Sequence, residues 1–281
     1  MPAPLVLSIQ SRVAFGHVGN SAAAFLLQRQ GFEVVELPTV LLSAHPGHGR
    51  PGGGAISADM LASMLDGLDR IGVLERVAGV IVGYLGTPAN GVVAAEAVRR
   101  VKAVHPAAPV LVDPVIGDRD GGAYVADGIL ECFRDRLIPL ADIVKPNHFE
   151  LEALAGRPLA TPAEALAALD ALGPGLSVVT SFEAGDGLLT TLLRMGGRAH
   201  VARTWPVAEP PHGLGDSLGA LLLAGLLSGL APAAALGKAL GVVEALIAEA
   251  ARLGLDELPL IEAQHLIDSA PPVVLEPLSS S

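Results

Sequence analysis

The sequence predicts an α/β fold of three layers, in which helices flank a mostly parallel central sheet. Two observations predict it. Apolar runs with the pattern of strands alternate with longer helical patterns, which is typical of parallel sheets wrapped by helices. In addition, 51% of the 281 residues are hydrophobic and only 3% are aromatic, so small aliphatic side chains must fill a large and tightly packed core.

In the first half of the chain, helices and strands alternate. The strands are short apolar runs, and the helices begin at good capping residues, such as Asn20 or Ser21 for the first helix and Ser57 for the second. In order, the predicted elements are a strand at 4–11, a helix at 16–31, a strand at 32–38, a loop rich in Gly and Pro at 43–54, a helix at 57–72, a strand at 77–86, a helix at 90–105 and a strand at 109–118.

The second half continues the alternation before the pattern changes. Thr161 and Pro162 start one of its helices, and Gly196 with Gly197 connects two strands into an antiparallel hairpin. In order, the predicted elements are a helix at 128–138, a strand at 141–147, helices at 148–156 and 161–173, a strand at 176–182, hairpin strands at 188–195 and 198–205, several helices, and a tail rich in Pro and Ser at 270–281. We find no repeat and no linker, so one domain over residues 1–281 is expected.

Charge and cysteine content exclude some functions. The chain has a formal net charge of −11 and no basic run, so nucleic acid is not an expected partner. The single cysteine, Cys132, cannot form a disulfide within the chain, and the N-terminus lacks the pattern of a secretory signal, so a cytoplasmic protein is expected. Cys132 and Trp205 are both expected to be packing residues.

Residues 217–237 carry no charge, and this run is about long enough to cross a membrane. Pro232 would break it into two helices, however, and no basic residues precede it. The better interpretation is a buried pair of helices, so we expect no membrane partner.

Polar side chains stand where the predicted strands end. Ligands of parallel α/β sheets bind beyond the carboxyl ends of the strands, so these positions are the candidates for a site. They are Ser11, Tyr84, Asp113, Asp118, Asn147, Glu150, Thr180 and Ser181.

The stretch "GLGD" at the start of the apolar run is a further candidate. Gly213 and Gly215 allow a ligand to approach the backbone closely, and Asp216 begins the predicted helix. A helix N-terminus offers unpaired N–H groups and a partial positive charge to a phosphate. Asp216 could then accept a proton from a hydroxyl group while those donors hold the transferring phosphoryl group. The alternative is a plain aspartate N-cap after a glycine turn.

Three of the acids suggest a metal. Asp113, Asp118 and Glu150 follow neighbouring strands and could orient waters around a Mg²⁺ that bridges nucleotide phosphates. The alternative for each acid is a surface charge or a helix-start charge. Together, acids at successive strand ends favour phosphoryl transfer.

Seven sequence blocks carry a resemblance to a known family. They are "LSIQS", "GHVGNSAAAFLLQRQG", "GYLG", "DPVIGD", "PNHFELE", "VVTS" and "GLGD", in this order, between residue 5 and about residue 250. In this combination the chain resembles the pyridoxal kinases of the ribokinase-like superfamily.

The resemblance implies a function and a role for each candidate. The implied activity is ATP-dependent phosphorylation of the 5′-hydroxymethyl group of pyridoxal or a related B6 vitamer, with Mg²⁺, often a monovalent cation such as K⁺, and a homodimeric assembly. Asp216 matches the catalytic base, and Gly213, Leu214 and Gly215 match the anion hole. Ser11, Tyr84 and His45 fall on the substrate side. On the nucleotide side are Asp113, Asp118, Tyr124, Asn147, Glu150, Thr180 and Ser181, of which the three acids also lie near the metal.

The substrate loop departs from the family pattern. The family reads much like "NTVQFSNHTGYG", whereas residues 38–49 here read "PTVLLSAHPGHG". Pro46 replaces a threonine that holds the polar edge of the ring, and His48 replaces a tyrosine. A site that loses a hydrogen-bonding group discriminates less sharply. Two alternatives therefore stay open: a kinase for another small hydroxymethyl substrate, such as a pyrimidine or a sugar, and a non-catalytic B6-binding protein.

Two weaker signals lie in the same loop. Gly47, Gly49 and Gly52 match the spacing of a dinucleotide fingerprint, but Pro46 and Pro51 interrupt it and no strand-to-helix turn is predicted there. We expect a mobile flap over the pocket instead. His45 and His48 are either ligand contacts or solvated loop histidines, and His17 is expected to be structural.

Overall fold

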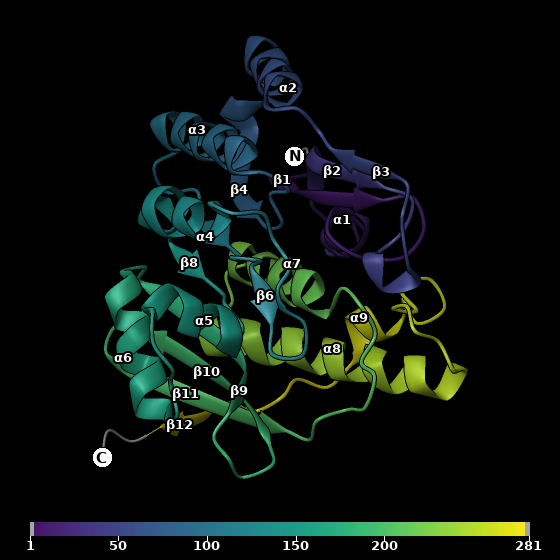
Figure 1. The fold of residues 1–281 in the computed structure, drawn as a ribbon, viewed down its shortest axis with the longest axis vertical. Helices are drawn as coiled ribbons and strands as arrows, with labels where there is room; N and C mark the ends of the chain where they lie inside the picture. Colours follow the sequence, from purple (N-terminus) through teal and green to yellow (C-terminus); the bar gives the residue numbers. More distant parts are fainter. Residues whose placement is uncertain (1–2, 279–281) are drawn as a thin grey trace.

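Ten strands form one sheet through the centre of the molecule (Figure 1). The computed structural model describes residues 3–278. From one edge of the sheet to the other, the strands are β12 (Glu276–Leu278), β11 (Arg198–Thr204), β10 (Leu189–Met195), β9 (Leu176–Glu183), β8 (Ile143–Val144), β5 (Val110–Val112), β4 (Val77–Val82), β1 (Leu5–Val13), β2 (Glu33–Leu42) and β3 (Gly53–Ala55). A separate small hairpin pairs β6 (Gly117–Asp118) with β7 (Gly122–Ala123).

The central strands are parallel and the edge strands are antiparallel. The pairs from β2 through β1, β4, β5 and β8 to β9 are all parallel. The hairpin of β10 and β11 is antiparallel, as predicted, and β3 pairs antiparallel with the end of β2. The predicted mostly parallel sheet is therefore confirmed.

Helices cover both faces of the sheet, which gives the three predicted layers (Figure 1). The helices are α1 (Asn20–Arg29), α2 (Ala58–Arg70), α3 (Pro88–Val104), α4 (Ile129–Cys132), α5 (His148–Ala155), α6 (Pro162–Leu172), α7 (Leu214–Leu227), α8 (Pro232–Leu253) and α9 (Leu266–Ser269). The alternation of β1 shows how the layers form. Val6 packs in the core with α1, α7 and α8, whereas Leu7 and Ile9 pack in the core with α2 and α3 on the opposite face.

The helix starts agree with the sequence in two of three cases. The Ser57 side chain accepts the Met60 N–H and caps α2, and Thr161 forms a capping box with Glu164 at the start of α6. The predicted cap of α1 at Asn20 or Ser21 is wrong. Gly19 is the N-cap, because the side chains of Asn20 and Ser21 instead donate to carbonyl oxygens of β1.

The uncharged run forms the predicted pair of buried helices. It contains most of α7 and the start of α8, with the break just before Pro232. Gly225 allows the two helices to pack closely, since a Cβ there would lie 2.9 Å from the Cβ of Ala235. Among residues 3–278 no helix is both long enough and apolar enough to cross a membrane.

Two predictions in the C-terminal half of the chain are wrong, one for the tail and one for Trp205. The segment 270–281 contains a strand as well as a tail, because β12 adds to the sheet beside β11; residues 279–281 lie outside the described part. Trp205 is not a packing residue. Its side chain is 75% exposed, because β11 ends at Thr204 and the chain leaves the sheet there.

Candidate active site

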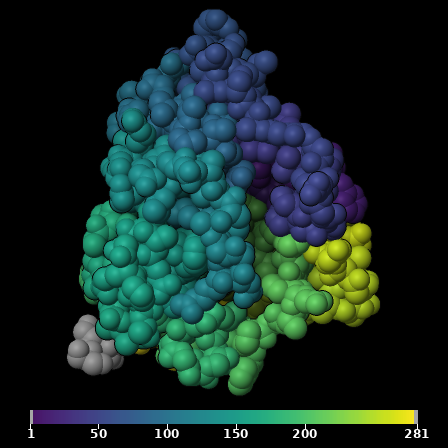
Figure 2. All heavy atoms as spheres, in the orientation of Figure 1, coloured from purple at the N-terminus to yellow at the C-terminus, as the bar shows by residue number. Residues whose placement is uncertain are grey.

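The structure brings the predicted site residues to one edge of the sheet. Tyr84, Asp113 and Asn147 lie just beyond the ends of the parallel strands β4, β5 and β8. Ser11 and Thr180 lie in the last halves of β1 and β9, because both strands continue past the ends that the sequence predicted. Figure 2 shows a hollow between the purple to blue surface on the right and the teal surface in the centre, with green atoms at its floor. The strand order changes direction at β1, which has β2 on one side and β4 on the other. Such a switch point is where parallel sheets bind ligands.

Asp216 lies in the first turn of α7 rather than at its cap. The helix begins at Leu214, two residues before the predicted start, and Gly213 is its N-cap with a φ of 86°. The Asp216 carboxylate accepts the N–H of Gly19 at 2.7 Å, from the loop before α1. The alternative of a plain aspartate N-cap is therefore wrong.

The backbone at the start of α7 offers free donors. The first N–H group with a helical partner is that of Ser217, which donates to the carbonyl of Gly213 at 2.9 Å. Within the described chain the N–H groups of Leu214, Gly215 and Asp216 have no hydrogen-bond partner. Donors of this kind at a helix N-terminus form an anion site.

Two glycines allow the loop and helix to meet. A Cβ at Gly213 would overlap the carbonyl oxygen of His17. A Cβ at Gly19, whose φ is 55°, would overlap both the carbonyl oxygen and the hydroxyl of Ser11. Ser11 therefore sits against the same peptide group that holds Asp216.

The surroundings of Asp216 change its acidity. Burial raises the pKa of Asp216 to about 6, and the charge of Asp113 acts in the same direction, while the Gly19 N–H and the charge of Lys145 oppose the increase. The residue as a whole is only partly buried. Asp216 is thus a carboxylate at neutral pH with a raised affinity for a proton, which suits a general base.

Glu150 and Asn147 are held by the start of α5. They form a capping box, in which Asn147 accepts the Glu150 N–H at 2.9 Å and Glu150 accepts the Asn147 N–H at 2.7 Å. Glu150 also accepts the Ile116 N–H at 3.0 Å. Burial, together with the charge of Asp113, raises the pKa of Glu150 to about 8. Asn147 donates to the Gly117 carbonyl and so connects α5 to the β6–β7 hairpin.

The β6–β7 hairpin and strand β9 carry the remaining residues predicted for the nucleotide side. Asp118 is exposed and accepts the Gly121 N–H. The Tyr124 N–H donates to the Ile116 carbonyl at 3.1 Å. Burial raises the pKa of the Tyr124 phenol, and the charges of Glu150 and Asp118 act in the same direction. Thr180 pairs with Asn147 through a β-bridge. Ser181 has a φ of 52°, a conformation that few residues other than glycine adopt.

The sequence reasoning missed Lys145. Its side chain is only 3% exposed and forms an ion pair with Asp113 at 2.8 Å. A Cβ at Gly215 would lie 3.8 Å from the Lys145 Nζ, so the ammonium group is close to the start of α7. The available signal was a lysine directly after the apolar strand residues Ile143 and Val144, since lysine is almost never buried without a partner.

The loop over the site, residues 43–54, is called the flap. It closes on itself through Ser43 and Gly52, whose backbone groups are hydrogen bonded. His48 is paired with Glu257 at 2.6 Å, and Glu257 also accepts the His17 N–H at 2.9 Å.

A second contact joins the flap to the segment before the anion site. The ring of His45 stacks on the ring of His212, with centroids 3.9 Å apart. The Nδ1 of His45 accepts the Gly47 N–H. Neither Glu257 nor His212 stood out in the sequence, because they lie far along the chain from the flap.

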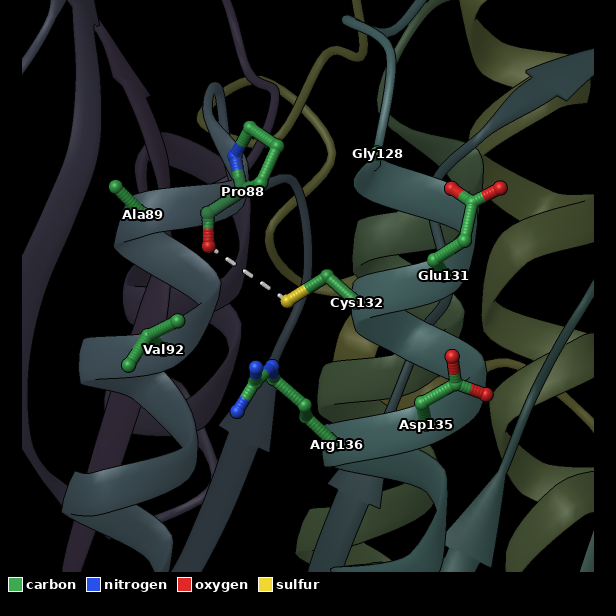
Figure 3. Close-up of a pocket in the computed structure, with 8 residues that line it drawn as sticks. All are labelled: Pro88, Ala89, Val92, Gly128, Glu131, Cys132, Asp135 and Arg136. Carbon is green, nitrogen blue, oxygen red and sulfur yellow. Dashed lines mark hydrogen bonds between the residues drawn. The ribbon is translucent and has the colours of Figure 1, made fainter.

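Cys132 is a packing residue, as predicted. A pocket of about 590 Å³ lies between α3 and α4, and Figure 3 shows Cys132 in it, with its thiol donating to the carbonyl of Pro88 at 3.7 Å. Burial raises the pKa of the thiol, and a thiol that stays protonated is a poor nucleophile. This pocket shares no residue with the predicted site.

The residues fit a magnesium ion that is held mainly by water and phosphates. Within the described chain, no group of three or more His, Cys, Asp or Glu side chains could hold a metal ion by itself. Asp113, Glu150 and Asp216 nevertheless lie close enough together for the charge of Asp113 to help burial raise the pKa of the other two. Mg²⁺ is commonly bound by one or two carboxylates together with substrate phosphates and water.

Comparisons with known proteins agree with this geometry. Residues 74–260 match the family described as phosphomethylpyrimidine kinase. The chain is 41% identical over 275 residues to a protein from Rubrobacter xylanophilus named pyridoxal kinase PdxY, covering 95% of this chain and 94% of that protein. It is 39% identical over 271 residues to the protein of the same name from Deinococcus radiodurans, covering 92% and 91%.

Solved structures give the same result. Pyridoxal kinase from Leishmania donovani in complex with ADP and pyridoxamine superposes with a TM-score of 0.92 at 29% identity, covering 98% of this chain and 100% of that chain. Pyridoxal kinase from Trypanosoma brucei superposes with a TM-score of 0.87 at 27% identity, covering 99% and 100%. The fold is the ribokinase-like fold that the sequence predicted, and the chain belongs to the phosphomethylpyrimidine kinase family and, within it, to the pyridoxal kinases.

Proposed function

We propose that this protein transfers the terminal phosphoryl group of ATP to the 5′-hydroxymethyl group of pyridoxal or a related B6 vitamer. The observation that carries the proposal is the Asp216 carboxylate beside three unpaired N–H groups at the start of α7. This pairs a proton acceptor with an anion site, which is what phosphoryl transfer to an alcohol requires. Supporting it are the curated relatives named pyridoxal kinase and the Leishmania donovani kinase structures with ADP and either pyridoxamine or pyridoxine.

In the proposed mechanism the acceptor lies between the ends of β1 and β4. Ser11 and Tyr84 position the ring there, and Asp216 accepts the proton of the hydroxymethyl group as the new P–O bond forms. The N–H groups of residues 214–216 stabilise the charge on the transferring phosphoryl group. The flap, which His45 joins to His212, excludes water from the reaction.

The nucleotide is proposed to bind on the other side of Asp216. The polyphosphate and the base would contact Tyr124, Asn147, Thr180 and Ser181. The waters of a magnesium ion would be held by Asp113, Asp118 and Glu150. When bound, Mg²⁺ neutralises charge on the nucleotide phosphates. The monovalent cation and the homodimer that the resemblance implies remain predictions. Activity in K⁺ compared with Na⁺, and light scattering of the purified protein, would test them.

The test is an activity assay on the purified protein with ATP and Mg²⁺. Pyridoxal, pyridoxine and pyridoxamine are each supplied as acceptors, and the phosphate ester is measured directly. We expect ester formation with pyridoxal in preference to other alcohols. ADP release without a phosphorylated vitamer would contradict the proposal, and any product formation excludes a non-catalytic B6-binding protein.

A second candidate is a kinase for another small hydroxymethyl compound, such as a pyrimidine. The flap favours this alternative, because Pro46 has no N–H to donate and begins the short helical turn at Pro46–His48. The match to phosphomethylpyrimidine kinases also agrees with it. A hydroxymethylpyrimidine and a panel of sugars in the same assay separate the two, since a higher kcat/KM than for pyridoxal would favour this candidate.

The acidity of Asp216 predicts a pH dependence. Only the ionised carboxylate can accept the hydroxyl proton, and burial raises its pKa to about 6. We therefore expect kcat/KM, which reports the free enzyme, to fall about tenfold per pH unit below that value and to level off above it. A pH profile of kcat/KM between about pH 4.5 and 8.5 checks this. A midpoint near the usual value for aspartate, about 4, would contradict the role of burial.

The His48–Glu257 pair predicts an effect on acceptor binding, measured as KM, that is separate from the rate of phosphoryl transfer. The hydrogen bond to Glu257 raises the pKa of His48, with the charges of Glu257 and Asp256 in support. The pair therefore holds the flap below this raised pKa and loses its ion-pair character as the pH rises through it. We expect His48→Gln to raise the acceptor KM about two- to fivefold at neutral pH, since ion pairs that water can still reach contribute little.

The control for the flap is His265→Gln, which changes an exposed histidine outside the flap. The two variants are compared through acceptor KM and kcat at neutral pH and above the raised pKa. The difference between His48→Gln and the unchanged protein should shrink at the higher pH. An unchanged acceptor KM in His48→Gln would mean that the pair does not hold the flap over the acceptor.

A further inference from the structure

Lys145 carries a buried positive charge that the proposed mechanism does not use. It follows β8, and its backbone N–H donates to the carbonyl of Val112 at the end of β5. Its side chain is 3% exposed and that of its partner Asp113 is 7% exposed, with 2.8 Å between Nζ and Oδ2. Hydrophobic side chains of similar volume often replace a buried ion pair without loss of stability, so the fold does not by itself explain this lysine.

The side chain of Lys145 runs beneath the first turns of α7. A Cβ at Gly219 would lie 3.4 Å from the Lys145 Cε, and a Cβ at Gly215 would lie 3.8 Å from Nζ and 3.9 Å from the Asp113 Oδ2. The ammonium group thus lies at the Gly215 end, on the side of the backbone that glycine leaves without a side chain.

This position places the positive charge of Lys145 beside the positive end of the α7 dipole. The N-terminus of α7 carries a partial positive charge and three N–H groups without partners among residues 3–278. A cation is unfavourable at a helix N-terminus, because the helix dipole favours anions there. An anion between the ammonium group and the N–H groups would be favourable for both.

The ammonium group also has capacity for such an anion. An ammonium has three N–H donors, and in the described part of the chain the one ion-pair partner of Lys145 is Asp113. Asp113 fixes the direction of the side chain and leaves other donors to bind a phosphate oxygen.

We propose that Lys145 is a phosphate-binding residue for phosphoryl transfer, whose ammonium group, tethered by Asp113, binds the terminal phosphate of the nucleotide together with the N–H groups of residues 214–216. This inference rests on the proposed function, since it names a further group of the same site. Asp113 then acts as the tether of Lys145 in addition to its place near the metal.

The test measures nucleotide binding without magnesium. Lys145→Met keeps the length of the side chain and removes its charge, and the double variant Lys145→Met with Asp113→Asn avoids leaving a buried carboxylate unpaired. We expect both to weaken binding of a non-hydrolysable ATP analogue about 10- to 100-fold, the range of a charge-assisted hydrogen bond. Adenosine binding should stay within about twofold, because adenosine lacks the phosphate that Lys145 would bind. Titration calorimetry gives both affinities.

Two controls separate phosphate binding from structural damage. Lys102→Met removes a surface lysine that is paired with Asp142 and should leave both affinities unchanged. Lys145→Ala is assayed with propylammonium and with neutral propanol, and only the cation should restore part of the affinity for the ATP analogue. This measurement serves also if the methionine variant does not fold.

The proposal is overturned if the affinities for the ATP analogue and for adenosine fall together, if neither falls, or if propylammonium restores nothing. A failure of the proposed function gives a different result. If the unchanged protein phosphorylates no B6 vitamer but Lys145→Met still loses affinity only for the ATP analogue, the role of Lys145 stands and the acceptor is wrong. If the unchanged protein is active and the loss is not specific to the ATP analogue, the role of Lys145 alone is wrong.

Discussion

Asp216→Asn is expected to lower kcat about 10²- to 10⁴-fold, the contribution of a general base. Asparagine has nearly the shape of aspartate, and its side-chain oxygen can still accept the Gly19 N–H that Asp216 accepts at 2.7 Å. The loop and the start of α7 should therefore stay in place, and the affinity for a non-hydrolysable ATP analogue should change little. Steady-state kinetics with pyridoxal measure kcat, and calorimetric titration with the analogue measures the affinity.

The matched control is Asp59→Asn, which changes another aspartate in the first turn of a helix, α2. This variant should retain full activity. If Asp216→Asn kept kcat within about tenfold of the unchanged protein, Asp216 would not be the base. If it lost affinity for the ATP analogue as well as kcat, Asp216 would act on the anion site and not on the proton.

Gly19→Ala is expected to lower kcat about 100-fold, the size of the loss when a catalytic group is misplaced by about 1 Å. The new Cβ would overlap the carbonyl oxygen and hydroxyl of Ser11, and the positive φ of 55° would add strain. The chain must move to relieve both, and the peptide that holds Asp216 moves with it. Kinetics and the thermal midpoint of unfolding measure the two consequences.

Gly31→Ala is the control for backbone strain alone. Gly31 follows α1, has a φ of 89°, and a Cβ there would meet nothing within 4 Å. This variant should lose stability, by about 1–2 kcal/mol, and keep its kcat. Equal losses of kcat in the two variants would mean that the effect of Gly19→Ala is unfolding and not the displacement of Asp216.

The sequence predicted the layers of the fold well, because strands and helices leave periodic apolar patterns. The parallel strand ends at Ser11, Tyr84 and Asp113 followed directly, since every parallel strand points its carboxyl end to the same edge. The start of α7 was placed two residues late, because a glycine cap with a positive φ leaves no side-chain signal. The strand β12 was missed because a three-residue edge strand is too short to show alternation.

Contacts between distant segments could not be predicted from one sequence. The Gly19 N–H and Asp216 are 197 positions apart, and His48 and Glu257 are 209 positions apart. No local pattern encodes such pairs, because they depend on how loops meet above the sheet. The burial of Lys145 has the same origin: its pairing with Asp113 follows from the adjacency of β5 and β8, which the alternation of elements does not determine.

The most direct test of the account is a crystal structure with a non-hydrolysable ATP analogue and pyridoxal. We expect the terminal phosphate at the N–H groups of residues 214–216, and the 5′-hydroxyl within about 2.6–3.2 Å of the Asp216 carboxylate. A terminal phosphate bound elsewhere, or a hydroxymethyl group pointing away from Asp216, would contradict the account.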